Sequence, residues 1–430
     1  MAKPTIRFKG YTEDWEQRKL IDFVDVLDGD RGKNYPTSDD FDISGHTLFL
    51  NASNVTNDGF LFQDNQFITE EKSNSMGNGK LEEDDIVVTS RGSLGHIAWY
   101  NADISSFVPY ARINSGMLIL RNKKEVETEY LYHFMKSSKG QSQISFISFG
   151  SAQPQLTKKG VEDLEVILPI KRDEQVQLGH YFSNLDHLIT LHQRKCEETK
   201  ILKKYMLQKM FPQNGQKVPE IRFKCFTEDW EQRKLSEFVD KAVDNRGKTP
   251  PLDENGTHPL IEVAALGGVH PNYSKVDKYL SDDSFENNLR AYIKKGDILF
   301  TTVGSIGLVS LMDSREEAAI AQNIVAFRAK ENFIPEYLYA LFSNEENQYK
   351  ANRIVMGAVQ PSIKVSQLVD VEYMLTRNVK EQKKIGSFFS NIDNLITLHQ
   401  RISLYFLKIN TFVWEQRKLG DILISLQNNT

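Results

Sequence analysis

The chain has 430 residues, more than one ordinary core needs, and this length suits two domains with connecting elements. It contains no apolar run near the roughly eighteen residues that a membrane-spanning helix requires, and its start does not resemble a signal peptide, so we expect a cytoplasmic protein. The two cysteines, Cys196 and Cys225, are too few for a disulfide framework. The net charge of −5 argues against a chain that binds nucleic acid tightly by itself, but it allows binding through one face or together with a basic partner.

The N-terminal segment begins an internal repeat. Residues 12–20 (TEDWEQRKL) recur as residues 227–235, and residues 182–194 (FSNLDHLITLHQR) recur almost unchanged as residues 389–401. Strings of this length do not match by chance. The chain is one domain-plus-helix unit written twice.

Between the matching strings, the two copies share a pattern rather than a sequence. Short apolar runs bounded by Gly, Asn and Asp predict strands at residues 86–88, 117–120 and 324–327. Residues 130–134 and 337–342 predict a matching short helix in each copy. Each copy is therefore expected to be a mixed α and β domain.

Each copy ends in a long amphipathic helix. Apolar residues recur there at alternating spacings of about four and three, which is typical of a coiled-coil seam. Pro169 and Pro212 bracket the first helix, because proline is excluded from helix interiors. We expect two antiparallel spacers of roughly 55 and 45 Å, at about 1.5 Å per residue. The residues predicted to form the seam are Leu178, Phe182, Leu185, Ile189, Ile385, Phe389, Ile392 and Ile396. Further apolar residues flank it, Leu188, Leu202, Leu395 and Ile402, so the stripe is wider than two helices need, and either the faces of the domains cover the excess or partner helices complete a bundle.

The C-terminal segment starts the repeat a third time, because residues 414–419 read WEQRKL. We expect this tail to lie beside the first domain or the entrance to its helix. His192 and His399 fall on the predicted seam, where a hydrogen-bonded core histidine is favoured over a metal ligand. The expected fold class is α+β with a pseudo-two-fold internal repeat. Its parts are domains at residues 1–170 and 213–378, spacer helices at 171–212 and 379–411, and a tail at 412–430.

Two similar domains held apart by rigid helices suit a ligand that is gripped at two separated points. One turn of B-DNA is about 34 Å, so spacers of this length fit two half-sites about one turn or slightly more apart. Because the middles of the two copies have diverged, the half-sites are expected to differ.

Two Gly-x-x-Gln-Pro strings, at residues 150–154 and 357–361, are each followed by an acidic-Gln pair, Glu174-Gln175 and Glu381-Gln382. With these motifs the chain resembles, along essentially its whole length, the DNA-specificity subunit of a type I restriction–modification enzyme. The resemblance implies two target recognition domains, two antiparallel conserved helices and no catalytic activity. It also implies double-stranded DNA, two methyltransferase subunits and two restriction (endonuclease/translocase) subunits as partners. S-adenosylmethionine, and ATP with magnesium, then belong to those partners and not to this chain.

Several basic and turn residues are candidates for phosphate contacts, which should survive sequence divergence. Arg31 and Lys33 in one copy match Arg246 and Lys248 in the other, although a solvated surface explains any single one of them equally well. The Gly-Ser turns offer backbone N–H groups and hydroxyls for phosphates, or they are ordinary turns. Their candidate residues are Arg91, Ser93 and Ser305.

Base-reading residues are expected where the scaffold is shared and the side chains differ. Counted from His46 and His258, Asn51 aligns with Glu262; the first could pair with adenine and the second could accept from cytosine, or each could be a polar strand end. The remaining candidates are Arg112 and Asn114, the comparable Gln322 and Asn323, and Gln153 and Gln360, which could contact DNA or a partner or merely close a turn.

Enzyme classes find little support in the sequence. It has neither a dinucleotide-binding nor a phosphate-loop string, nor the Asn/Asp-Pro-Pro-Tyr/Phe string of amino-methyltransferases. Residues 70–72 (EEK), with Asp58 or Asp64 upstream, superficially resemble a nuclease motif, but the second copy lacks it. No metal site is expected. The alternative that remains is a non-catalytic scaffold with two protein-binding sites.

Overall fold

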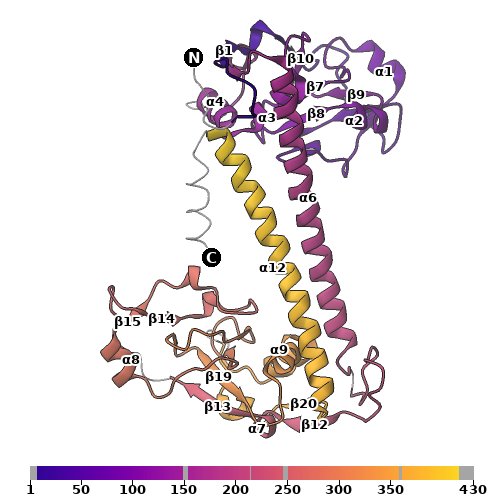
Figure 1. The fold of residues 1–430 in the computed structure, drawn as a ribbon. Coiled ribbons are helices and arrows are strands. Elements are labelled where there is room, and N and C mark those ends of the chain that lie inside the picture. The colour runs from indigo at the N-terminus through magenta and orange to yellow at the C-terminus, as the bar shows by residue number, and fades with distance from the viewer. Residues whose placement is uncertain (1–6, 149–153, 214, 246–249, 358–360, 416–430) are drawn as a thin grey trace. The chain divides into compact units, whose positions relative to one another are not determined.

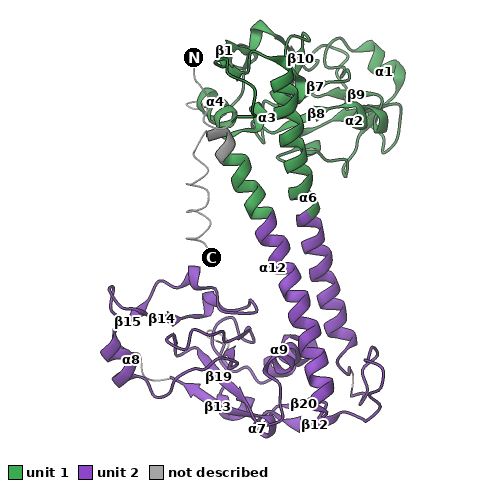
Figure 2. Ribbon diagram, viewed as in Figure 1, with its two compact units in different colours: residues 1–191, 403–430 green, residues 192–402 purple. Residues whose placement is uncertain are grey.

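The computed structural model describes residues 7–148, 154–213, 215–245, 250–357 and 361–415, with side chains described as far as residue 411. The chain divides into two compact units, each with its own core (Figures 1 and 2). Unit 1 comprises Met1–Leu191 with Ser403–Thr430, and unit 2 comprises His192–Ile402.

Unit 1 is built on an antiparallel four-stranded sheet of order β2-β10-β7-β8. A second, three-stranded sheet has the order β6-β3-β9, and β1 pairs with β11. The elements are β1 (Glu16–Lys19), η1 (Leu20–Asp22), β2 (Val24–Asp28), η2 (Ser38–Asp40), β3 (Thr47–Leu50), η3 (Ala52–Asn54), β4 (Val55–Thr56), β5 (Gly59–Phe60), β6 (Phe67–Ile68), α1 (Glu70–Ser75), β7 (Asp85–Thr89), β8 (Ile97–Tyr100), α2 (Ala102–Phe107), β9 (Ala111–Ile113), β10 (Met117–Asn122), α3 (Thr128–Lys136), α4 (Ser138–Ser148), α5 (Lys158–Glu162), β11 (Glu165–Leu168) and the first part of α6 (Arg172–Lys209).

The four-stranded sheet of unit 1 is covered on both faces, and this explains its run of β-branched residues. Ile86 and Val88 of β7 point to one face and join the cluster that contains Phe182 of α6. Val87 between them points to the other face and joins the cluster that contains Leu50 of β3. Successive side chains of a strand alternate between faces, so a strand buried on both sides is apolar at every position.

Unit 2 repeats this plan, with a four-stranded sheet of order β13-β19-β16-β17, a three-stranded sheet of order β15-β14-β18, and a pair formed by β12 and β20. Its elements are β12 (Glu231–Lys234), α7 (Leu235–Phe238), β13 (Val239–Asp244), β14 (His258–Ile261), η4 (Val263–Ala265), η5 (Tyr273–Lys275), β15 (Tyr279–Leu280), α8 (Asp282–Asn288), β16 (Ile298–Thr301), β17 (Val309–Leu311), β18 (Ala319–Ile320), β19 (Ile324–Ala329), α9 (Pro335–Ser343), α10 (Glu345–Asn352), α11 (Val365–Leu368), β20 (Glu372–Leu375) and the first part of α12 (Val379–Glu415).

The predicted α+β fold with an internal repeat is therefore confirmed. The predicted strands lie in β7, β10 and β19, and the predicted short helices lie in α3 and α9. The alignment from the two histidines also holds in space. Leu48 pairs in parallel with Ala111 in unit 1, and Leu260 pairs in parallel with Ala319 in unit 2.

The helices α6 and α12 are each continuous from one unit into the other, and within each unit they run antiparallel. In unit 1, Asp186 of α6 contacts Asn410 near the end of α12. In unit 2, Lys203 near the end of α6 contacts Asp393 near the start of α12. Helix α12 runs past residue 411, where we expected the tail to begin. Residues 416–430, on which most of the tail prediction falls, lie outside the described residues.

The predicted seam requires a correction. In unit 1, Leu178, Phe182 and Leu185 pack into the domain's own core, and in unit 2 Ile385, Phe389 and Ile392 do the same. Ile189 is buried as well, and Ile396 lies against the core of unit 2. The apolar period correctly indicated a covered helix face, but most of these residues are covered by the domain of their own unit.

Candidate nucleic-acid interface

Most of the candidate residues that the structure describes lie in the loops at one edge of the four-stranded sheet of their unit, which we call the loop edge. Because the strands of unit 1 alternate in direction, β2 and β7 end at the same edge at which β8 and β10 begin. The loops that follow or precede them are consequently neighbours. The Ser90 N–H donates to the Gly116 carbonyl at 2.8 Å, and an Arg31 Nη donates to the Ser115 carbonyl at 3.3 Å.

The Gly-Ser turns have the same backbone construction in both units. The threonine that ends the strand donates its hydroxyl to a serine carbonyl in the turn, Thr89 to Ser93 and Thr301 to Ser305. Gly92 and Gly304 have φ values of 73° and 78°, a region that glycine enters without steric cost. The geometry of the turn explains these glycines, and it leaves Ser93 and Ser305 exposed at the tip.

The residues that follow each Gln-Pro string lie against the same turn. The Leu156 N–H donates to the Ser90 carbonyl at 3.0 Å, and the Ile363 N–H donates to the Thr302 carbonyl at 2.8 Å. In unit 1 the side chains meet as well, since Arg91 Nε donates to Gln155 Oε1 at 3.1 Å. The structure therefore brings together two motifs that the sequence separates. Gln153 and Gln360 themselves lie outside the described residues.

The basic loop after β2 lies at this edge too. Asp30 accepts the N–H groups of Gly32 and Gly77, both at 2.6 Å, and the first of these bonds is the main reason that the pKa of Asp30 is lowered. This carboxylate fixes the loop and leaves Arg31 and Lys33 exposed. Their counterparts Arg246 and Lys248 lie outside the described residues.

Asn51 and Glu262 occupy equivalent places, each preceding a short 3₁₀ helix, η3 or η4. Asn51 Oδ1 accepts from the Ser53 N–H at 2.8 Å, and Glu262 Oε1 accepts from Lys278 Nζ at 2.8 Å. Asn51 is at the same edge, because the Asn114 N–H donates to the Leu50 carbonyl next to it.

Asn114 Oδ1 accepts from the Gly116 N–H at 2.8 Å. In unit 2, Gln322 is exposed and the Asn323 carbonyl accepts from the Thr302 N–H at 2.8 Å. All three residues therefore belong to the loop that enters β10 or β19. They share the edge with the Gly-Ser turn, as a set of base-reading side chains requires.

Arg112 does not join this edge, and its predicted role in base reading needs correction. The residue is 3% exposed, and its guanidinium donates to Ser73 Oγ at 2.9 Å and to the Asn78 carbonyl at 2.9 Å. Burial lowers the pKa of Arg112, an effect that nearby Asp30 opposes. Its counterpart in the strand register of unit 2 is Ile320. A position that accepts an apolar residue in the second copy is part of the scaffold.

One buried carboxylate fixes the start of each long helix. Glu174 is fully buried and accepts two hydrogen bonds from Arg7, at 2.6 and 2.7 Å. Glu381 is equally buried and accepts from Arg222 at 2.6 and 2.9 Å. Each arginine belongs to an Ile-Arg-Phe-Lys string that is repeated in the sequence, as the glutamates are, but the repetition alone does not show that the arginine and the glutamate meet.

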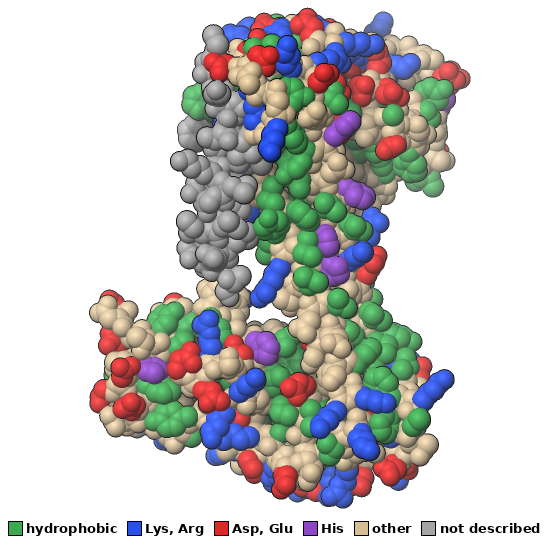
Figure 3. All heavy atoms as spheres, in the orientation of Figure 1, with side chains coloured by type: hydrophobic (Ala, Val, Ile, Leu, Met, Phe, Trp, Pro, Cys, Tyr) green, Lys and Arg blue, Asp and Glu red, His purple; other side chains and the backbone are tan. Residues whose placement is uncertain are grey.

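The surface of the two helices carries exposed apolar side chains that differ from the predicted seam. Hydrophobic side chains follow the visible face of α12 (Figure 3). Those that are exposed in unit 1 are Leu404, Tyr405 and Leu407, and those in unit 2 are Ile201, Leu202, Tyr205, Leu395 and Leu398. Exposed apolar residues gathered in this way are typical of a protein-binding surface.

The histidines of the seam form a hydrogen-bonded pair, as expected. The two Nδ1 atoms of His192 and His399 are 2.8 Å apart. Among the residues that the structure describes, no group of His, Cys, Asp and Glu is placed to hold a metal ion, and no helix could cross a membrane. The lysine of the superficial nuclease motif, Lys72, is paired with Asp40 at 2.9 Å.

The chain has two similar domains, two long helices that pair with each other, and the same set of loops in each domain. These features define a class of proteins that recognise a ligand through two domains. The family model described as type I restriction modification DNA specificity domain matches residues 12–200 and 227–404. The chain belongs to this family. Its function is accordingly the recognition of DNA sequence in a type I restriction–modification system, and it is a non-catalytic component of that system.

Two similar proteins match this chain over 90% of its length. The type I restriction enzyme MjaVIII specificity subunit of Methanocaldococcus jannaschii is 25% identical over 400 residues, which cover 90% of this chain and 88% of that protein. The putative type I restriction enzyme MjaX specificity subunit of the same organism is 23% identical over 90% of this chain and 89% of its own length.

Solved structures show the same fold. The crystal structure of the type I restriction–modification S subunit from M. genitalium has a TM-score of 0.62 at 12% identity and covers 96% of this chain and 98% of its own. A chain from a structural study of complex assembly and conformational transition of the type I R-M system has a TM-score of 0.52 at 16% identity, with 94% of this chain and 97% of that chain covered.

Proposed function

We propose that each unit reads one half-site with the loop edge of its four-stranded sheet. The chain thereby directs its complex to a bipartite, asymmetric DNA site with an unspecified gap, for adenine methylation or restriction. The observation that carries the proposal is that the backbone of the Gly-Ser turn is alike in the two units, whereas the side chains around it differ. Several backbone hydrogen bonds of the turn recur in both units, among them Gly95 N–H to the Thr89 carbonyl and Gly307 N–H to the Thr301 carbonyl. The side chains differ, because Arg91 and Gln155 of unit 1 are replaced by Val303 and Ser362, which form a β-bridge in unit 2.

Within this edge we assign two kinds of contact. Phosphate contacts position the duplex and carry no sequence information, and base contacts in the groove specify it. The phosphate contacts are assigned to Arg31, Lys33, Arg91, Ser93, Arg246, Lys248 and Ser305. The base contacts are assigned to Asn51, Asn114, Gln153, Glu262, Gln322, Asn323 and Gln360, and Arg112 is removed from the set.

The exposed apolar surface of the helices is assigned to the methyltransferase partners. We propose two methyltransferase subunits and two restriction subunits around this chain in the cytoplasm, with recognition domains at residues 1–170 and 213–378. S-adenosylmethionine, ATP and magnesium belong to those partners. Apolar side chains presented along helices suit partner helices, because helices pack through apolar stripes.

The test is methylome sequencing of a host that expresses this chain with its methyltransferase. The expected result is one adenine-methylated motif with two specified blocks and a gap. A continuous palindrome, or no motif, would contradict the proposal. The complex should also lose DNA affinity steeply as salt rises, because phosphate contacts release counterions, whereas a protein-binding scaffold would show no such dependence.

A further inference from the structure

Two equivalent aspartates, Asp186 of α6 and Asp393 of α12, each face the opposite long helix in their own unit. Each has a lysine nearby, but the two lysines come from different elements of the fold. The copies are 207 residues apart in this region, as the histidine pair shows. Asn410 is therefore the counterpart of Lys203, and Ser343 is the counterpart of Lys136. These two exchanges distinguish the surroundings of the two carboxylates.

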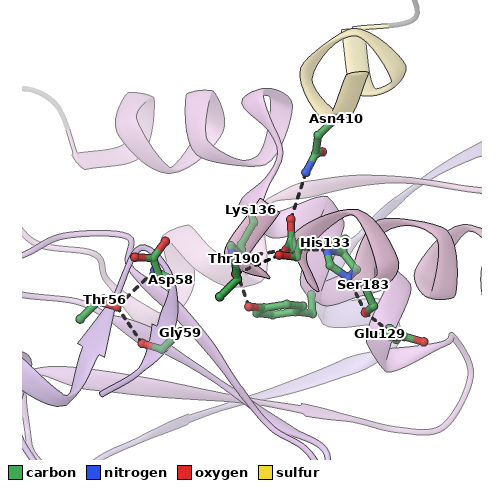
Figure 4. Close-up of polar contacts among 11 residues, drawn as sticks. Thr56, Asp58, Gly59, Glu129, His133, Lys136, Ser183, Thr190 and Asn410 are labelled. Carbon is green, nitrogen blue, oxygen red and sulfur yellow. Dashed lines mark hydrogen bonds and ion pairs between the residues drawn. The ribbon is translucent and has the colours of Figure 1, made fainter. Parts of the chain in front are cut away.

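In unit 1 the domain supplies the cation (Figure 4). Lys136 of α3 lies with its Nζ 3.8 Å from Asp186 Oδ2, and Asn410 of α12 donates to Asp186 Oδ1 at 3.2 Å. His133 Nδ1 is 3.7 Å from the same carboxylate, but burial lowers the pKa of His133 to about 3, so its ring is neutral near pH 7. The contact that Asn410 of the opposite helix makes with Asp186 is thus with a neutral amide.

In unit 2 the opposite helix supplies the cation. Lys203 of α6 donates to Asp393 Oδ1 at 2.6 Å, with side chains that are 18% and 7% exposed. Helix α9 has Ser343 in the place of Lys136, and the Ser343 hydroxyl donates to the Tyr339 carbonyl instead. Oδ2 of Asp393 is buried and has no hydrogen-bond partner among the described residues. Lys203 is therefore the main source of positive charge for this carboxylate, and the nearby ring of His270 makes a smaller contribution.

We propose that these contacts form a pairing code, in which the charge on the opposite helix selects α12 for α6 and rejects a second copy of the same chain. The native pairing gives each aspartate one lysine. In a swapped dimer, α12 would pair with α12, and Asp393 would face Asn410, with Ser343 and His270 of its own unit nearby but no lysine. Two buried carboxylates would then lack their lysine, which is strongly unfavourable. The same dimer would place Lys203 beside an Asp186 that Lys136 already serves.

The consequence is that one chain pairs its two different domains through one helix pair instead of assembling like halves of two chains. This inference concerns the assembly of the chain and does not depend on which DNA the loop edges read. It therefore goes beyond the proposed function.

The first test asks whether charge at Asp393 is what matters. In the full-length chain, Lys203→Asn should lower the Tm, whereas the matched control Lys204→Asn should not, because Lys204 is 63% exposed in its pair with Glu345. Adding Ser343→Lys to Lys203→Asn copies the arrangement of unit 1 and should restore most of the loss. Adding Asp393→Asn instead removes the need for a cation and should restore it too. If neither addition restores the Tm, Lys203 acts through packing and the proposal is overturned.

The second test inverts the code. With Lys203→Asn and Asn410→Lys together, the native pairing leaves Asp393 without a lysine, while the swapped dimer gives each aspartate one. Size-exclusion chromatography with light scattering should then show a species of twice the monomer mass that increases with concentration, and differently tagged copies should purify together. Lys204→Asn with Asn410→Lys is the matched control and should stay monomeric. A double variant that stays monomeric, whether or not its Tm falls, overturns the pairing code.

Discussion

The fully buried Glu381 gives a sharp test of how the long helices are attached to their domains. In Glu381→Gln the side chain keeps its size but loses its charge, and Arg222 is left without the carboxylate to which it donates at 2.6 and 2.9 Å. Thr376 loses a carboxylate acceptor at 2.7 Å. Breaking a buried ion pair by removing one partner costs about 3 to 5 kcal/mol. Because Arg222 also donates to the Glu228 carbonyl, we expect the lower end, about 3 kcal/mol.

The loss can be measured by thermal unfolding. For a unit of this size about 1 kcal/mol corresponds to about 2 to 4 °C, so we expect the Tm of the transition that reports unit 2 to fall by roughly 6 to 12 °C. The control is Glu220→Gln, whose carboxylate contacts Lys209 at the surface with a side chain that is 62% exposed. The Tm of this control should hardly change. If Glu381→Gln is no more destabilising than the control, the buried pair does not fasten the helix and our reasoning fails.

Three further predictions concern specificity, pH and assembly. Arg112→Met should lower stability and leave the methylated motif unchanged. Asn114→Ala should instead relax the sequence requirement of one half-site, at a cost of about 1 to 3 kcal/mol in discrimination between bases. A relaxed motif in Arg112→Met would contradict the assignment of Arg112 to the scaffold. The pKa of His133 is about 3 in the folded protein and near 6.5 in the unfolded chain, so this histidine binds a proton more readily when the chain is unfolded. Stability should therefore fall as the pH drops below about 6.5, and His133→Ala should flatten this acid limb in pH-dependent unfolding; an unchanged limb would exclude this histidine as its source. Leu398→Glu with Leu404→Glu should abolish co-purification with the methyltransferase without lowering the Tm, and retained binding would place the partner elsewhere.

The repeat, the mixed domains and the two long helices could be predicted because they depend on local signals. Identical strings reveal a duplication directly, and the spacing of residues such as Leu178 and Phe182 reveals a helix with one apolar face. The spacing does not show what covers that face. Both residues turned out to lie in the core of unit 1, and the exposed stripe on α12 is made of other side chains.

The loop edge could be predicted only in part, because it depends on contacts between distant segments. The position of Arg31 beside Ser115 follows from the order of the strands, which the sequence does not reveal. Arg112 has the side chain of a base reader, and only its burial shows that it serves the scaffold. The bond between Arg7 and Glu174 joins residues 167 positions apart, and no local pattern indicates such a pair.

The construction of the Gly-Ser turns that carry Ser93 and Ser305 bears on how readily the DNA target of such a protein can change during evolution. Its shape is set by main-chain hydrogen bonds, by a threonine hydroxyl and by glycines, so the side chains at the rim contribute little to folding. Most substitutions that create a new activity also consume stability. Here a residue such as Arg91 can be replaced at small cost, as Val303 in the second copy illustrates. The molecule can therefore acquire new targets by mutation while its scaffold keeps its full margin against unfolding.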